Sequence, residues 1–139
     1  MSAEQNKANL RRLFIETMSH GNLSVADELL TPDHLSRGLQ TPIPGREGFK
    51  MAVGMFRAAF PDMTVTIDEM VAEGNKVASC GTMSGTHQGE FFGIPATGKR
   101  ISLGYSDVWT VENGQFSEHT VQHDLLGLMQ QLGAIPASQ

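Results

Sequence analysis

Three residues near the carboxyl end of the chain have side chains that could transfer protons in catalysis. Asp107 lies in the segment RISLGYSDVWTV, and His119 and Asp124 lie in SEHTVQHDLLGLMQQLG. An aldol-type reaction needs a base that removes a proton beside a carbonyl group and a donor that stabilises the enolate. Carboxylate and imidazole groups in a dry pocket can supply both functions. These three residues are therefore the candidate catalytic groups.

Asp107 has the most informative surroundings of the three. In a strand it shares one face with the apolar residues Ile101, Leu103, Tyr105 and Trp109. If this face points inward, loss of hydration raises the pKa of the carboxyl group toward a range useful for proton transfer. The alternatives are an ion pair with one of the basic residues at the start of the strand, or an exposed position beside a bulge.

The segment around His119 and Asp124 allows two interpretations of each residue. Asp124 directly precedes the apolar run LLGLMQQLG, so its carboxylate could instead cap a helix by accepting backbone N–H groups. Strand alternation places Phe116 and Thr120 on one face and His119 on the other. If the first face lines a pocket, His119 points away from it and is a surface or interface residue.

His119 and His123 also raise the question of a metal site. At a spacing of four on a helix they would share one ion. The residues between them, Thr120 and Val121, favour a strand. Four strand residues span roughly 13 Å, which is too far for one ion. We expect no metal.

The elements that position these residues follow from periodicity. Apolar residues at helical spacing predict helices over residues 3–18, 24–30 and 48–60, the last ending before Pro61. Alternation then predicts four strands joined as an antiparallel meander, in MTVTIDEMVAE, VASCGTMSGTH, RISLGYSDVWTV and QFSEHTVQH, followed by a short helix from about Leu125 to Leu132. Helices that precede an antiparallel sheet make an α+β domain, and a curved sheet wrapped on helices leaves a pocket at its open end.

Composition limits the classes of partner. The 139 residues suit one domain, residues 1–139. A net charge of -5 with scattered basic residues argues against nucleic acid or an anionic membrane as a partner. Cys80 is the sole cysteine, which excludes an intramolecular disulfide. Because the chain lacks a signal-peptide pattern and an apolar run of ~20 residues, we expect a cytoplasmic location.

Several motifs together resemble one known family. The segments GREGFK, FRAAFPDMTV, GTHQGEFFGIPATGKRI and SEHTVQHDLLGLMQQLG resemble successive motifs of the SnoaL-like polyketide cyclases. These belong to the superfamily of nuclear transport factor and ketosteroid isomerase. The resemblance covers nearly the whole chain. It implies a cone-shaped α+β barrel with N-terminal helices packed on a curved, mainly antiparallel sheet, a deep pocket for a small hydrophobic molecule, and a homodimer.

The resemblance also implies a reaction. Family members include enzymes that close a polyketide ring by an aldol-type carbon–carbon bond, without a metal or organic cofactor, and relatives hydroxylate, isomerise or dehydrate. We therefore expect a cofactor-free acid–base enzyme acting on a hydrophobic carbonyl compound. The alternative is a non-catalytic protein of the same fold that binds a small hydrophobic ligand.

The resemblance bears on individual residues as well. Asp124 matches an acidic residue thought to take part in acid–base work in the cyclases, and His119 matches the histidine of an EHW-like motif. Thr120 replaces the aromatic residue of that motif. Arg37 stands where family members often carry a histidine and could hold a ligand oxygen at the pocket mouth, as could His34; the alternative is a solvated loop. The predicted ligand-binding residues are Arg37, Phe56, Tyr105, Trp109 and Thr120.

Overall fold

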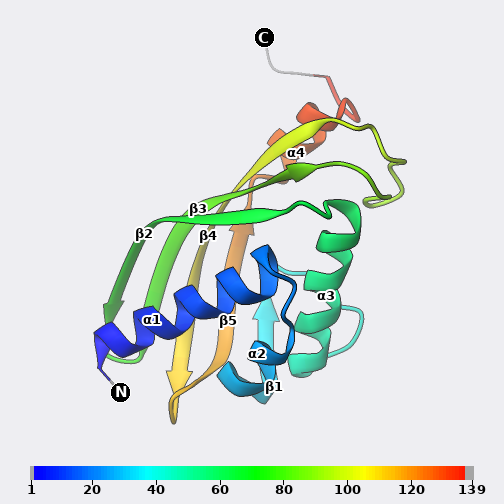
Figure 1. Ribbon diagram of the computed structural model, residues 1–139. Helices are drawn as coiled ribbons and strands as arrows, with labels where there is room; N and C mark the ends of the chain where they lie inside the picture. The colour runs from blue at the N-terminus through cyan, green and yellow to red at the C-terminus, as the bar shows by residue number, and fades with distance from the viewer. Residues whose placement is uncertain (1, 137–139) are drawn as a thin grey trace.

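The protein is represented by a computed structural model that describes residues 2–136, drawn in Figure 1. The helices are α1 (Ala3–Phe14), α2 (Ser24–Leu29), α3 (Gly45–Ala59) and α4 (Leu125–Leu132), and a π-helical turn, η1 (Ile15–Ser19), continues α1. The strands are β1 (Leu30–Arg37), β2 (Thr64–Glu73), β3 (Lys76–Thr86), β4 (Arg100–Glu112) and β5 (Gln115–His123).

The strands form one five-stranded sheet in the order β1-β5-β4-β3-β2. Strands β2 to β5 pair antiparallel with their sequence neighbours, so the predicted meander and the α+β class are confirmed. Strand β1 pairs parallel with β5 at one edge. The sheet is therefore mainly antiparallel, as predicted.

Strand β1 corrects the sequence prediction, which placed His34 and Arg37 in a loop. Its sequence, LTPDHLSR, contains Pro32 and lacks the alternation of a half-buried strand. Pro32 is tolerated because an edge strand forms ladder hydrogen bonds on one side only, and the register with β5 shifts between Leu30 and Leu35. Leu30 and His34 are buried, so β1 directs a histidine into the interior.

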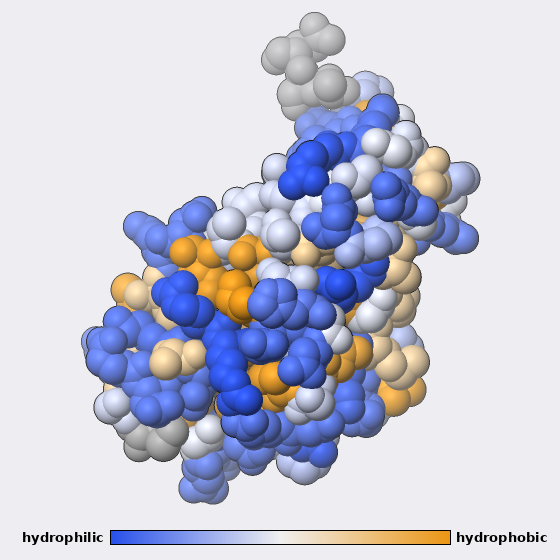
Figure 2. Space-filling view, in the orientation of Figure 1, coloured by the Kyte–Doolittle hydropathy of each residue, from blue (hydrophilic) through white to orange (hydrophobic). Residues whose placement is uncertain are grey.

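The helices cover the concave side of the curved sheet, where the core lies. Figure 1 shows α1 lying across the strands and α3 beside β1. Phe14 of α1 packs edge-on against Tyr105 and Trp109 of β4, with ring centroids 5.7 and 5.6 Å apart. Figure 2 shows this face of the molecule as mainly hydrophilic, with smaller hydrophobic areas between polar side chains. None of the helices within residues 2–136 is long and apolar enough to cross a bilayer.

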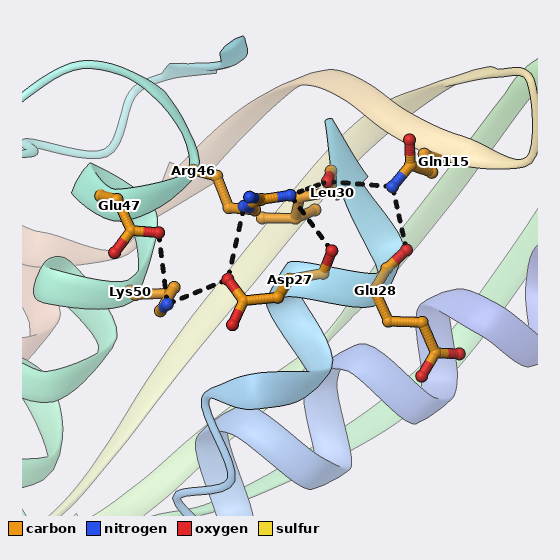
Figure 3. Close-up of polar contacts among 7 residues, drawn as sticks. All are labelled: Asp27, Glu28, Leu30, Arg46, Glu47, Lys50 and Gln115. Carbon is orange, nitrogen blue, oxygen red and sulfur yellow. Dashed lines mark hydrogen bonds and ion pairs between the residues drawn. The ribbon is translucent and has the colours of Figure 1, made fainter. Parts of the chain in front are cut away.

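A polar network fixes the start of β1 against α3 and β5 (Figure 3). The Arg46 guanidinium donates to the carbonyl oxygens of Asp27 and Leu30 at 3.1 and 3.2 Å. The Gln115 side-chain amide donates to the carbonyl oxygens of Glu28 and Leu30 at 3.0 and 3.3 Å. These carbonyl groups lie where α2 ends, and the last carbonyls of a helix have no partner within it. The network thus joins α2, α3 and β5 at the point where β1 enters the sheet.

Candidate active site

A pocket lies between the concave face of the sheet and the helices. Four titratable side chains, Tyr105, Asp107, His119 and His123, share it with mainly apolar ones, namely Phe14, Met18, Leu39, Phe49, Val53, Phe56, Met63, Met83, Trp109 and Val121. The hollow measures about 520 Å³ including the part open to solvent, and little of this space is wide enough to hold a water molecule. A ligand larger than a few waters requires side chains to move, and the flexible methionines suit such movement.

Asp107 is 7% exposed and projects from β4 into this pocket. The Ser79 hydroxyl of β3 donates to Asp107 Oδ1 at 2.5 Å. Burial raises the pKa of the Asp107 carboxyl, while the Ser79 hydrogen bond and the Trp109 indole act in the opposite direction. The apolar strand face predicted from the sequence therefore does point inward.

A bulge in β5 directs His119 into the same pocket. Thr110 of β4 pairs with Glu118 and Val111 pairs with Phe116, so Ser117 is an extra residue on β5. Because a bulge reverses the alternation of side chains, both Phe116 and His119 are buried, at 2% and 3% exposed. The strict alternation used in the sequence interpretation placed these two residues on opposite faces and is wrong at this point.

His119 is held between two other rings. The Trp109 indole stacks on it, with ring centroids 4.0 Å apart and planes 8° from parallel. His119 Nδ1 lies 2.8 Å from Nε2 of His34. Burial lowers the pKa of His119 well below its usual value, and His34 and His123 lower it further. Burial also lowers the pKa of His34. Both imidazoles are therefore neutral at pH 7.

Asp107 and His119 are diagonal neighbours on adjacent strands. Val121 lies opposite Asp107, and Trp109 lies opposite His119. Diagonal side chains on one face of a sheet are about 7 to 8 Å apart. A carbonyl group and its neighbouring carbon can lie between two groups at that separation. The pocket thus combines a carboxyl with a raised pKa and an imidazole with a lowered one.

Most of the chain matches one known protein family. Residues 8–132 match the family described as SnoaL-like polyketide cyclase. The chain belongs to this family.

Individual SnoaL-like relatives match over most of their length. The nogalonic acid methyl ester cyclase of Streptomyces nogalater is 26% identical over 86% of this chain and 91% of its own. The aklanonic acid methyl ester cyclase DnrD of Streptomyces peucetius is 28% identical over 90% of this chain and 89% of its own. The structure of TsrD from Streptomyces laurentii is 31% identical and superposes with a TM-score of 0.89, covering 97% of this chain and 99% of its own.

Three residues predicted for the SnoaL-like site do not line the pocket. Arg37 is exposed and forms an ion pair with Glu118 Oε2 at 3.1 Å. Thr120 is exposed on the outer face of β5, because the bulge that turns His119 inward turns its neighbour outward. Asp124 is exposed and caps α4, accepting the backbone N–H of Gly127 at 3.0 Å. Phe56, Tyr105 and Trp109, by contrast, lie on the pocket wall.

Residues that the sequence interpretation did not select also contribute to the site. Ser79 could have been found, because alternation along β3 places it on the same inward face as Val77. His34 was considered only for the pocket mouth, and its contact with His119 gave no local signal because the two residues are 85 positions apart. Within residues 2–136, no group of three His, Cys, Asp or Glu side chains is arranged to hold a metal ion.

The capping contact predicts a stability effect for Asp124. Asp124→Ala removes the acceptor of the Gly127 N–H and should lower the free energy of unfolding by about 1 kcal/mol, measured by urea denaturation. Asp124→Asn keeps an acceptor and should be nearly neutral. Loss of turnover in Asp124→Asn at unchanged stability would contradict a capping role alone.

Proposed function

We propose that this protein closes a ring in a hydrophobic, polyketide-like carbonyl compound by a cofactor-free, aldol-type acid–base reaction. The observation that carries this proposal is the pair formed by Asp107 and His119 across one apolar pocket. The SnoaL-like relatives named as cyclases of nogalonic and aklanonic acid methyl esters support the reaction class. Isomerisation of a carbonyl compound uses the same two groups and is the nearest variant of this function.

The protonation states favour one division of roles. Two titratable groups whose pKa values are pushed in opposite directions are a common pattern for an acid and a base in one site. The lowered pKa keeps His119 neutral, so its imidazole can accept a proton. The raised pKa favours the protonated form of Asp107, which can donate to a carbonyl oxygen. His119 is the proposed base and Asp107 the proposed acid.

The proposed ring closure balances without a co-reactant. His119 removes a proton from the carbon beside a carbonyl group, and the electrons of that C–H bond form an enolate. The enolate carbon attacks a second carbonyl carbon, which makes the new carbon–carbon bond and breaks the C=O π bond. Asp107 protonates the resulting alkoxide, and the proton on His119 then returns to Asp107 through water. The product is an isomer of the substrate.

The pocket walls assist each charged stage. The Trp109 ring, parallel to His119, presents its electron-rich face to the imidazolium once it forms. Few waters reach the interior, so electrostatic interactions there are strong. The Tyr105 hydroxyl donates to the carbonyl oxygen of Thr66 at 3.0 Å, and burial raises the pKa of this hydroxyl. Tyr105 is therefore a wall residue and not a proton donor to the substrate.

The proposal is tested with nogalonic acid methyl ester as the first probe. The purified protein should convert it to a cyclic isomer of the same mass, separated by chromatography, and His119→Gln should not. Saturable binding without turnover of this ester or of aklanonic acid methyl ester would instead support the ligand-binding alternative. Neither binding nor turnover of any hydrophobic carbonyl compound would contradict both functions.

The outer face of the sheet supports the homodimer that the resemblance implies. Leu35 of β1 and Val108 of β4 are apolar, yet they are 49% and 46% exposed. A second copy of the chain covering this face would remove both side chains from water. Light scattering should then give twice the chain mass, and Val108→Glu should shift it toward the monomer. A monomer at all concentrations would contradict the dimer.

A further inference from the structure

Two buried histidines form a chain of hydrogen bonds that ends at a backbone carbonyl group. His34 Nδ1 lies 2.8 Å from the carbonyl oxygen of Phe116, and His34 Nε2 lies 2.8 Å from Nδ1 of His119. His34 is 1% exposed and His119 is 3% exposed. The chain therefore runs from the backbone of β5, through a side chain of β1, back to a side chain of β5.

The carbonyl group fixes where every proton in this chain lies. A carbonyl oxygen can only accept, so Nδ1 of His34 carries a hydrogen. A neutral imidazole has one N–H group, so Nε2 of His34 is bare and accepts the N–H of His119 Nδ1. By the same rule Nε2 of a neutral His119 is bare. No residue within 2–136 forms a hydrogen bond to that nitrogen, and His119 lines the pocket.

The surroundings keep both rings neutral. Burial is the main influence on each pKa and lowers both of them. The Glu118 and Asp33 carboxylates and the Phe116 carbonyl raise the pKa of His34, but they do not overcome burial. For His119, the neighbouring His34 and His123 act in the same direction as burial.

Aromatic contacts hold the His119 ring in this orientation. Trp109 lies parallel to it at 4.0 Å, and Phe49 meets it edge-on at 6.0 Å between ring centroids. A 180° turn of the ring about the Cβ–Cγ bond would put Cδ2 in the place of Nδ1 and break the hydrogen bond to His34. Nδ1 of His119 therefore bonds to His34, and Nε2 is left for the pocket.

We propose that His34 is a positioning residue that holds His119 in the tautomer with a hydrogen on Nδ1 and a bare Nε2 facing the pocket. The catalytic consequence rests on the function proposed above, whereas the tautomer is a property of the resting protein. A bare Nε2 can accept a substrate proton but cannot donate one. His34 thereby assigns the role of base to His119 and leaves the role of donor to Asp107.

The tautomer can be observed directly. In protein labelled with ¹⁵N at histidine, two-bond ¹⁵N–¹H correlation at pH 7.5 distinguishes ring nitrogens that carry a hydrogen from those that do not. For the wild type we expect His119 to show a protonated Nδ1 and a bare Nε2, and His34 to show the same pattern. A hydrogen on Nε2 of His119, or on both nitrogens of either ring, would overturn the proposal.

Two variants test the effect of His34 on its neighbour. His34→Phe keeps a flat ring but offers no acceptor, so His119 should populate the form with hydrogen on Nε2, and kcat should fall about 10²-fold with little change in KM. His34→Gln can donate to Phe116 and accept from His119, so it should restore part of the spectrum and of kcat. An unchanged His119 spectrum in folded His34→Phe would overturn the proposal.

The outcomes separate this proposal from the proposed function. If the wild type shows the expected tautomer but His119→Gln turns over substrate normally, the acid–base function fails and the structural assignment of His34 stands. If the wild type is an active cyclase but His119 carries hydrogen on Nε2, the function stands and the role of His34 fails. If His34→Phe does not fold, the wild-type spectrum alone decides.

Discussion

Asp107→Asn is expected to lower kcat/KM for ring closure by a factor of about 10² to 10⁴, the usual contribution of a positioned acid or base. The asparagine has the same shape, and its carbonyl oxygen can still accept from Ser79, whose hydroxyl lies 2.5 Å from Asp107 Oδ1. Its amide cannot transfer a proton to an alkoxide. The loss should therefore appear in kcat, with KM nearly unchanged.

The matched control for this prediction is Asp124→Asn. It makes the same chemical change at an exposed residue that caps α4 and does not line the pocket. It should retain wild-type kcat/KM in the same assay. Equal activity of Asp107→Asn and the wild type, with both proteins folded, would remove Asp107 from the mechanism. A larger loss of kcat/KM in Asp124→Asn than in Asp107→Asn would place Asp124 in the mechanism.

Acidification below about pH 6.5 should destabilise the fold steeply. His34 and His119 have pKa values lowered by burial, so the folded state binds fewer protons than the unfolded chain, whose histidines titrate near 6.5. The stability that His34 and His119 contribute is fully present above pH 6.5 and is lost as the pH falls below 6.5. Each such histidine reduces the free energy of unfolding by up to about 1.4 kcal/mol per pH unit.

Asp107 acts on the pH dependence in the opposite direction. Its pKa is raised in the folded state, so its contribution is greatest below the ordinary carboxyl value of 3.8 and is lost as the pH rises through the folded pKa. Asp107 therefore reduces the loss of stability on acidification only over the pH range in which its carboxyl group titrates. The steepest loss from the histidines should lie about one unit or more below pH 6.5, where the unfolded histidines are almost fully protonated.

Urea denaturation between pH 5 and 8 measures this dependence. His123, whose pKa burial also lowers, supplies a single-residue test. His123→Gln should reduce the slope by up to about 1.4 kcal/mol per pH unit. A wild-type protein equally stable at pH 5 and pH 7 would show that the buried histidines bind protons without unfolding.

Much of the fold follows from periodicity in the sequence. The alternation in RISLGYSDVWTV places Asp107 with Tyr105 and Trp109, and all three line the pocket. The predicted bounds of β5 and α4 match the structure. These elements are long or strongly patterned, and their burial is decided by local spacing. Asp107 could therefore be selected before any contact was known, whereas the direction of its strand face was left open.

Other parts of the site depend on long-range pairing that local patterns do not contain. Strand β1 includes Pro32 and has only two buried residues, so its place in the sheet follows from pairing with β5 and from the network around Arg46. The bulge at Ser117 arises from the register between β4 and β5. These two features bring His34 and His119 into contact. Strand alternation alone would put His119 on the wrong face.

Deuterium uptake from D₂O into recovered nogalonic acid methyl ester tests the acid–base account most directly, because it reports proton removal beside the carbonyl group whether or not the ring closes. The wild type should exchange deuterium into the ester, and His119→Gln should lose this exchange while it still binds the ester. Exchange at the wild-type rate in folded, ester-binding His119→Gln would contradict the assignment of His119 as the base.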